Sequence, residues 1–185
     1  MPLDVGVGLI LGVLLSQAST LPYSWCLLIG VIAALLPDID YVWSFIHPKR
    51  KTDTTHRDLL HYPLLFIPAV GLLGLLMSRQ ISVILMAGAF AHFVHDSFGV
   101  GFGLKWLFPL TRKSYMFLFQ ASTPRNKTMP KKLLYAWDDK ERATMIKQYG
   151  YSNWIRHIYF HPHPFGLFEY TALLIGILFA ITLHN

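Results

Sequence analysis

Charged side chains are scarce in this chain: 14% of its 185 residues are Asp, Glu, Lys or Arg, whereas 54% are hydrophobic. Soluble domains carry about 25% charged residues. The charge is also unevenly distributed, since residues 5–37, 59–78 and 80–95 contain none of these four residue types. Such apolar runs exclude disordered chains, coiled coils and nucleic-acid-binding tails. The composition therefore predicts a membrane protein.

Cysteine is almost absent, and the excess positive charge has an unusual location. The single cysteine, Cys26, lies in an apolar run, where it forms no disulfide within the chain and is expected to be a small buried residue. The formal net charge is +6. Because the basic residues border the apolar runs, the expected electrostatic partner is an anionic membrane surface, and no nucleic acid is expected.

Five apolar segments approach the length of about 20 residues that a membrane-spanning helix needs. Turn-forming residues 19–24 divide the first apolar run into two helices. The predicted spans are residues 5–20, 22–37, 62–78, 81–97 and 167–184. The sequence therefore predicts an all-α fold, a polytopic membrane helix bundle of about five spans. Because the first two spans are short, a partly re-entrant pair is an alternative, as is a soluble protein with very apolar helices.

The basic residues indicate the orientation of this bundle. Of the 16 Lys and Arg residues, four lie in residues 49–57, eleven lie in residues 105–156, and Arg79 stands alone. With five spans, both basic segments face the same side of the membrane. The positive-inside rule assigns that side to the cytoplasm. The predicted location is therefore the cell membrane, crossed several times.

Residues 105–166 form the largest segment outside the predicted spans and are rich in basic and aromatic residues. In residues 131–149, apolar residues recur near helical spacing opposite charged ones, which predicts an amphipathic helix at the membrane interface. The apolar face contains Leu133, Leu134, Trp137, Met145, Ile146 and Tyr149. A helix packed on the cytoplasmic end of the bundle is the alternative. We expect a single membrane domain with this segment as an interfacial insert, whose basic residues suit an anionic lipid head group.

Two short polar motifs stand at the ends of predicted spans. The first ends the second span with Asp38 and Asp40, two carboxylates that can converge on one cation. The second precedes the third span and contains His56, Arg57 and His61. Imidazole is a common ligand of Zn, Mn and Fe. Each motif taken alone is also compatible with an ordinary helix end at a membrane surface.

A third motif lies inside the fourth predicted span. His92 and Asp96 are four residues apart, a spacing that lets two side chains on one helix face bind the same metal. His95 could be a third ligand or could orient one from behind. Ionisable residues inside an apolar helix are costly, which favours a function for this motif. A His–Asp hydrogen bond that joins two helices is the alternative.

The predicted topology brings the three motifs together, because the second span ends, the third begins and the fourth ends on the same side. Oxygen and nitrogen ligands without cysteine suit a hydrolytic centre with one or two divalent ions, Zn or Mn. The predicted ligands are Asp38, Asp40, His56, His61, His92 and Asp96. Arg57 is expected to stabilise developing negative charge, and His95 to orient a ligand or transfer a proton.

These motifs resemble the signature of the YdjM-like inner-membrane family of metal-dependent hydrolases. The family motif LLPDID stands intact at Leu35–Asp40, and the motif H-x-x-x-D is kept by His92 and Asp96. The resemblance covers about residues 30–115, the central half of the chain. It implies a protein of the inner membrane and a metal-dependent hydrolase.

The chain departs from the family in the motif HRG-x-TH-S. The matching residues are His56, Arg57 and His61, while Asp58, Leu60 and Tyr62 replace the glycine, threonine and serine. The resemblance therefore implies a divergent member, in which the changed residues indicate a different substrate or a degenerate site.

The predicted function is metal-dependent hydrolysis at the cytoplasmic membrane face, through a water activated by the metal. The family is distantly similar to the helical zinc phospholipase C and nuclease enzymes, which implies a phosphoester or lipid-linked substrate. A metal or small-solute transporter is an alternative, although transport sites usually lie near the bilayer midplane. A membrane scaffold that holds a structural ion is the third candidate.

Overall fold

The computed structural model describes residues 1–40, 60–99, 101–118, 129–130, 132–150 and 154–183. Within them the chain is mostly helical, with one two-stranded sheet. The helices are α1 (Pro2–Ala18), α2 (Tyr23–Leu35), the 3-10 helix η1 (Leu36–Asp38), α4 (Pro63–Leu75), α5 (Arg79–Asp96), α6 (Asp139–Tyr149), α7 (Trp154–Tyr159) and α8 (Pro164–Thr182). The strands are β1 (Ser114–Phe117) and β2 (Leu134–Trp137).

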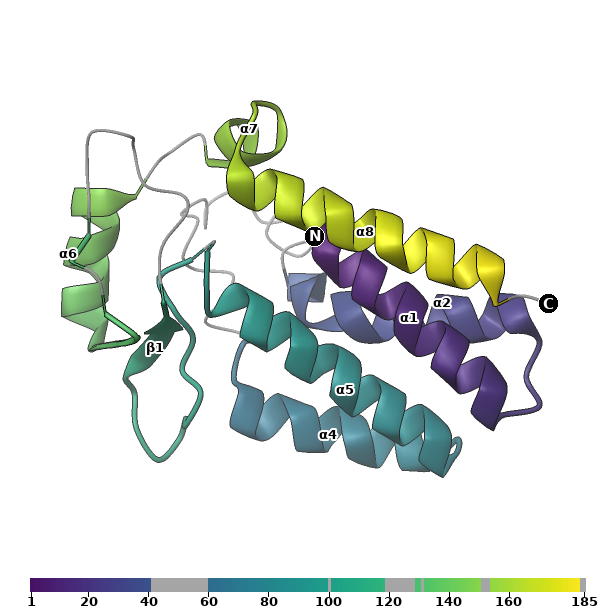
Figure 1. The fold of residues 1–185 in the computed structure, drawn as a ribbon. Coiled ribbons are helices and arrows are strands. Elements are labelled where there is room, and N and C mark those ends of the chain that lie inside the picture. The colour runs from purple at the N-terminus through teal and green to yellow at the C-terminus, as the bar shows by residue number, and fades with distance from the viewer. Residues whose placement is uncertain (41–59, 100, 119–128, 131, 151–153, 184–185) are drawn as a thin grey trace.

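The helices α1, α2, α4, α5 and α8 lie side by side and form the body of the protein (Figure 1). α1 packs against α2 and α8, while α5 packs against α1, α2 and α4. Each predicted span lies on one of these helices. α5 begins at Arg79, earlier than predicted, because the Ser78 hydroxyl accepts a hydrogen bond from the Ile81 amide and caps the helix. The predicted all-α fold is therefore confirmed in part, because the described residues are mostly helical but include one pair of strands.

The lengths of the helices bear on how many of them cross a membrane. In the part of the chain that the structure describes, α8 is the one helix that is both long and apolar enough for a span. Its 19 residues extend about 28 Å, close to the ~30 Å of a bilayer core. α1, α2 with η1, and α4 are apolar but shorter. The count of five spans therefore stays a prediction.

Glycines let α1 approach two of its neighbours closely. A Cβ atom on Gly30 of α2 would lie 2.5 Å from the backbone nitrogen of Gly12 on α1. A Cβ atom on Gly6 of α1 would lie 2.8 Å from the carbonyl carbon of Ala172 on α8. Side-chain atoms do not come this close to a backbone, so any larger residue would force the helices apart. These contacts fix the start of α1 between α2 and α8.

Replacing Gly30 by valine is expected to destabilise the bundle by at least the ~1–3 kcal/mol typical of overpacking. The added atoms would meet the backbone of α1, which cannot move aside as a flexible side chain can. The measurement is the thermal unfolding midpoint of the purified protein in detergent. Ile32→Val is the control on the same helix, because the Ile32 side chain is 45% exposed. Equal midpoints for the two variants would contradict the close packing.

The segment after α5 differs from the single amphipathic helix predicted over residues 131–149. β1 and β2 pair in antiparallel fashion, with Ser114 opposite Trp137. The helical prediction is wrong for Leu134–Trp137, where burial alternates with the two-residue period of a strand. The partner strand β1 is distant in sequence, so local spacing could not reveal it. α6 follows, and Asp138 and Glu141 form the capping box at its start.

α6 carries the rest of the predicted apolar face and lies beyond one end of the bundle (Figure 1). Its apolar side chains pack against a buried cluster from the sheet and the loop before it. The cluster contains Phe102, Met116, Tyr135 and Trp137, and the packed residues of α6 are Met145, Ile146 and Tyr149. α6 therefore packs on protein, with the strand pair as its support.

Candidate metal centre

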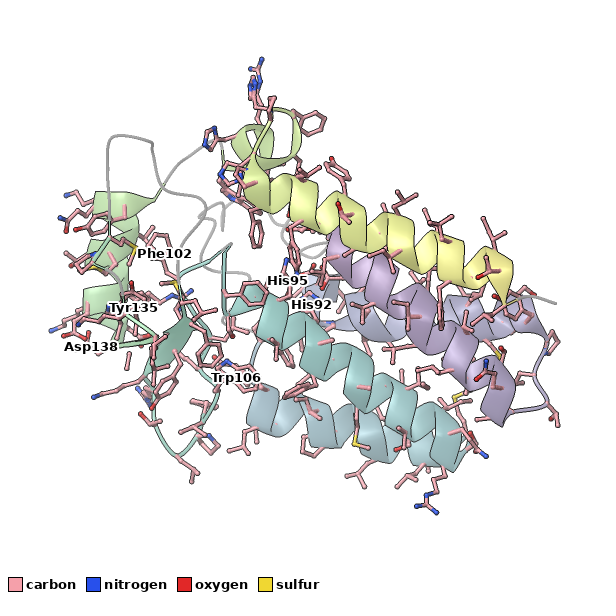
Figure 2. The ribbon with its side chains drawn as sticks, viewed as in Figure 1. His92, His95, Phe102, Trp106, Tyr135 and Asp138 are labelled. Carbon is pink, nitrogen blue, oxygen red and sulfur yellow. The ribbon has the colours of Figure 1, made fainter. Side chains whose placement is uncertain are left out.

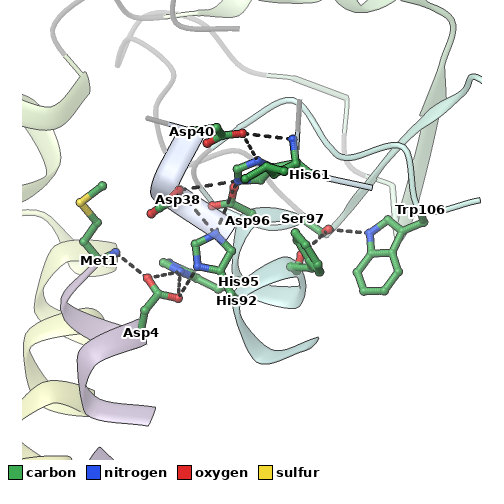
Figure 3. Close-up of polar contacts among 12 residues, drawn as sticks. Met1, Asp4, Asp38, Asp40, His61, His92, His95, Asp96, Ser97 and Trp106 are labelled. Atoms are coloured by element: carbon green, nitrogen blue, oxygen red, sulfur yellow. Dashed lines mark hydrogen bonds and ion pairs between the residues drawn. The ribbon is translucent and has the colours of Figure 1, made fainter. Parts of the chain in front are cut away.

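At one end of the bundle α1, α4 and α8 begin and α2 and α5 end (Figure 1). Polar side chains gather there (Figure 3). Pro37 lies in η1, the turn that ends α2, and Pro63 occupies the first turn of α4. Asp38 and His61 therefore stand at helix ends. His92 lies near the end of α5, in the same region (Figure 2). The structure thus brings together residues from all three sequence motifs.

Asp38, His61 and His92 form the centre of this group (Figure 3). One ligand atom from each lies within 4.8 Å of the others. The Nε2 atoms of His61 and His92 each lie 3.6 Å from Asp38 Oδ1. Asp96 Oδ2 lies 3.5 Å from His61 Nε2 and 4.0 Å from His92 Nε2. Two imidazole nitrogens and two carboxylate oxygens therefore face a common point.

These separations suit ligands that share one cation. Ligands at about 2.0–2.1 Å from Zn at tetrahedral angles lie about 3.3–3.4 Å from one another. The four imidazole–carboxylate separations of 3.5–4.0 Å are somewhat longer than this value and longer than an ordinary hydrogen bond. His92 Nε2 is buried and makes no hydrogen bond within the described residues, which is costly unless an ion binds it. The residues present therefore fit a metal ion.

The group is most buried on its imidazole side. The side chains of His61 and His92 are 0% and 1% exposed, whereas those of Asp38 and Asp96 are 18% and 11% exposed. The side of the common point that is formed by the two carboxylates is therefore the side nearest to solvent.

Asp40, one of the predicted ligands, lies behind His61 and does not face the common point. Its Oδ2 atom is 3.1 Å from His61 Nδ1 and accepts a hydrogen bond from the Leu60 amide at 3.3 Å. A carboxylate on the outer nitrogen of a ligand histidine holds the ring and directs the other nitrogen toward the metal. The position of Asp40 is therefore that of an orienting group.

Three carboxylates raise the pKa of His61. Burial alone would lower the pKa of this ring, but the nearby carboxylates of Asp38, Asp40 and Asp96 raise it from 6.5 to about 9. The ring of the metal-free protein is therefore protonated at neutral pH. Because a metal binds only the neutral ring, metal binding at His61 displaces a proton.

Sequence reasoning missed two buried carboxylates near this group, Asp4 of α1 and Glu169 of α8. Asp4 Oδ1 lies 3.3 Å from His92 Nδ1 and 3.2 Å from His95 Nδ1. Glu169 Oε1 lies 3.2 Å from His95 Nε2. A signal was present in the sequence, because each is a single acidic residue in an otherwise apolar segment, where ionisable residues are rare without a role.

His95, one of the two predicted catalytic residues, does not face the common point. The two ring nitrogens of His95 face Asp4 and Glu169. Arg57 and the predicted ligand His56 lie outside the described residues, so the structure does not place them.

The loop after α5 is tied to the end of that helix. The Ser97 hydroxyl donates to the Phe93 carbonyl at 2.7 Å and accepts a hydrogen bond from Trp106 Nε1 at 2.7 Å (Figure 3). This pair of bonds anchors the last turn of α5, which carries Asp96. The loop therefore helps to fix one of the four groups of the centre.

Comparison with known proteins shows where the chain belongs. A family model described as YdjM inner membrane protein matches residues 4–159. Searches of curated proteins and of solved structures found no match. The match extends on both sides beyond the motif resemblance at residues 30–115, and it includes Asp4 and all four residues that face the common point. The chain therefore belongs to the family of YdjM inner membrane proteins.

Proposed function

We propose that the protein is a membrane-bound hydrolase that uses a divalent metal to cleave a phosphoester or lipid-linked substrate at the cytoplasmic membrane face. The observation that supports this most is the convergence of His61, His92 and Asp38 on a common point. Aspartate and histidine without cysteine suit Zn or Mn. When bound, such an ion supplies Lewis acidity and lowers the pKa of a coordinated water toward neutrality.

The residues of this chain bind and orient the reactants in the proposed site. The four groups that face the common point suit a single ion, while Asp40 keeps Nε2 of His61 directed toward it. The buried imidazoles close one side, and the partly exposed carboxylates leave the other side to the substrate. Arg57 is proposed to stabilise negative charge that develops on the substrate.

The proposed membrane arrangement is supported by the family and by exposed apolar side chains. α4 and α8 expose large apolar residues, among them Leu72, Leu73, Leu75, Leu167 and Ile181. Large apolar side chains exposed along these helices suit lipid better than water. We place five helices across the inner membrane, the shorter ones accommodated by bilayer thinning, with the metal centre at the cytoplasmic end. A site at helix ends favours an enzyme over a transporter, whose site usually lies near the midplane.

The test combines metal analysis with hydrolysis assays on the purified protein. We expect a bound divalent ion, and release of phosphate or a phosphorylated head group from at least one lipid of a phosphoester panel. A chelator should abolish this release, and added Zn or Mn should restore it. Asp38→Asn, which keeps the size of the ligand but removes its charge, should lower both metal content and turnover.

Two outcomes would contradict the proposal. Bound metal without turnover of any lipid in the panel would contradict the hydrolase and favour a transporter or a scaffold with a structural ion. Protein that binds neither Zn nor Mn at micromolar to millimolar concentration would contradict the metal centre itself.

A further inference from the structure

A continuous chain of polar contacts links the candidate metal centre to α8. It begins at Nδ1 of His92, 3.3 Å from Asp4 Oδ1. Both carboxylate oxygens of Asp4 lie 3.2 Å from Nδ1 of His95 (Figure 3). Nε2 of His95 lies 3.2 Å from Glu169 Oε1, which accepts a hydrogen bond of 2.8 Å from the Tyr159 hydroxyl. This chain of contacts thus passes from α5 to α1, back to α5, and then to α8 and α7.

Asp4 stands behind His92 as Asp40 stands behind His61. In both pairs a buried carboxylate lies close to Nδ1, at 3.1 Å with a hydrogen bond for His61 and at 3.3 Å as an ion-pair contact for His92, and Nε2 of the same ring faces the common point. Carboxylates in this position orient ligand histidines and raise their affinity for the metal. The two halves of the centre are therefore built alike, although their carboxylates come from different helices.

The surroundings of His95 suit support of Asp4 rather than contact with a substrate. A carboxylate faces each of its ring nitrogens, so neither nitrogen is directed at the common point. The ring is buried and lies 6.1 Å, centre to centre, from the rings of both Phe98 and Phe165. With its position fixed in this way, His95 holds the carboxylate of Asp4 against His92.

Glu169 contacts His95 at the ring nitrogen that does not face Asp4. Its side chain is fully buried in an apolar helix, where an ionisable group is costly unless it is paired. The close approach of Gly6 and Gly176 holds α1 against α8, because a Cβ atom on Gly176 would lie 2.7 Å from the Cα atom of Gly6. The distance between Asp4 and Glu169 is thereby set by helix packing, with His95 between them.

We propose that Asp4, His95 and Glu169 are positioning residues of the metal centre, which act by fixing the ring of His92 and make the C-terminal helix α8 part of the site. The inference rests on the metal-binding function proposed above. It assigns Glu169 an effect on the His92 ring through His95 and Asp4, with no contact of its own to the ion.

The test is a titration of the purified protein with Co²⁺, whose visible absorption reports on its ligands. Loss of a group that supports a ligand typically weakens metal affinity about 10–100-fold. Since the effect should decline along the chain of contacts, we expect the dissociation constant to rise about 10–100-fold for Asp4→Asn and about tenfold for Glu169→Gln. Tyr159→Phe should have a smaller effect than Glu169→Gln. The spectrum should shift while the number of bound ions stays the same.

Thr171→Val is the matched control on α8, because the exposed Thr171 hydroxyl donates to the Leu167 carbonyl of its own helix. It should bind Co²⁺ like the wild type. Thermal unfolding in detergent shows whether each variant is folded. Glu169→Leu, which fills the same buried space without a polar group, serves as the second variant if Glu169→Gln does not fold.

The outcomes separate this inference from the function on which it rests. Wild-type affinity and spectrum in the folded Glu169 variants would overturn the inference and leave the metal centre intact. The inference would also be overturned if the Co²⁺ affinities of the variants ranked with their unfolding midpoints instead of with their position along the chain of contacts. That result would show a structural role alone. A wild-type protein that binds no Co²⁺ would overturn the proposed function and the inference together.

Discussion

Replacing His92 by alanine is expected to remove tight metal binding from the purified protein. His92 supplies a buried Nε2 atom that makes no hydrogen bond within the described residues and faces Asp38 at 3.6 Å. Loss of a ligand should weaken binding more than loss of a supporting group, which costs about 10–100-fold. We therefore expect the dissociation constant for Zn²⁺ or Co²⁺ to rise by more than ~100-fold. Calorimetric titration measures this constant directly.

The control for this experiment is another histidine of the same chain. His161 is exposed and lies outside the group that could hold a metal, so His161→Ala should bind the ion as the wild type does. Asp96→Asn should weaken binding as well, because Asp96 Oδ2 lies within 4.0 Å of both imidazole Nε2 atoms. Unchanged affinity in His92→Ala would contradict the proposed centre.

Lowering the pH from 9 to 7 is expected to weaken metal binding about 50-fold, because about half of the His61 rings are neutral at pH 9 and only about one in a hundred is neutral at pH 7. Asp38, Asp40 and Asp96 face this ring and hold its pKa at about 9, and the ring of His92 lies 5.7 Å away. The proton on His61 therefore competes with the ion throughout this range. Titrations in buffers of different ionisation enthalpy should show that at least about one proton is released for each ion bound at pH 7.

The metal-free protein should respond to pH in the opposite direction. Because the pKa of His61 is raised from 6.5 to about 9 on folding, the protonated ring stabilises the fold fully below pH 6.5. This stabilisation is lost as the pH rises through about 9. The unfolding midpoint of the metal-free protein should therefore fall between pH 7 and pH 9, and His61→Gln should reduce this fall. Metal affinity that does not change between pH 7 and pH 9 would contradict the assignment of His61 as a ligand.

The sequence by itself determined the helices of the bundle and the end at which the polar motifs meet. Helical hydrogen bonds are local, so apolar runs interrupted by turn-forming residues 19–24 and by charged residues were sufficient to place α1, α2, α4 and α5. Successive antiparallel helices then bring the end of α2, the start of α4 and the end of α5 to one side. Asp38, His61 and His92 had to lie near one another for this reason.

Local patterns were insufficient where the partner of a segment is distant in sequence. The residues of β2 have a spacing compatible with one face of a helix, but pairing with β1 makes them a strand. Asp4 and Glu169 lie near opposite ends of the chain, and only the packing of α1 against α8 brings both to His95. No spacing rule connects residues so far apart.

Only the tertiary structure decided which carboxylate faces the ion and which stands behind a ligand. Asp38 and Asp40 are chemically identical and two residues apart, yet Asp38 lies at Nε2 of His61 and Asp40 lies at its Nδ1. The turn that follows α2 and the ring held between the two carboxylates determine this difference. The sequence was enough to gather the polar groups, because helix direction depends on local patterns. The direction of each side chain depends on contacts between helices, and those exist only in the folded protein.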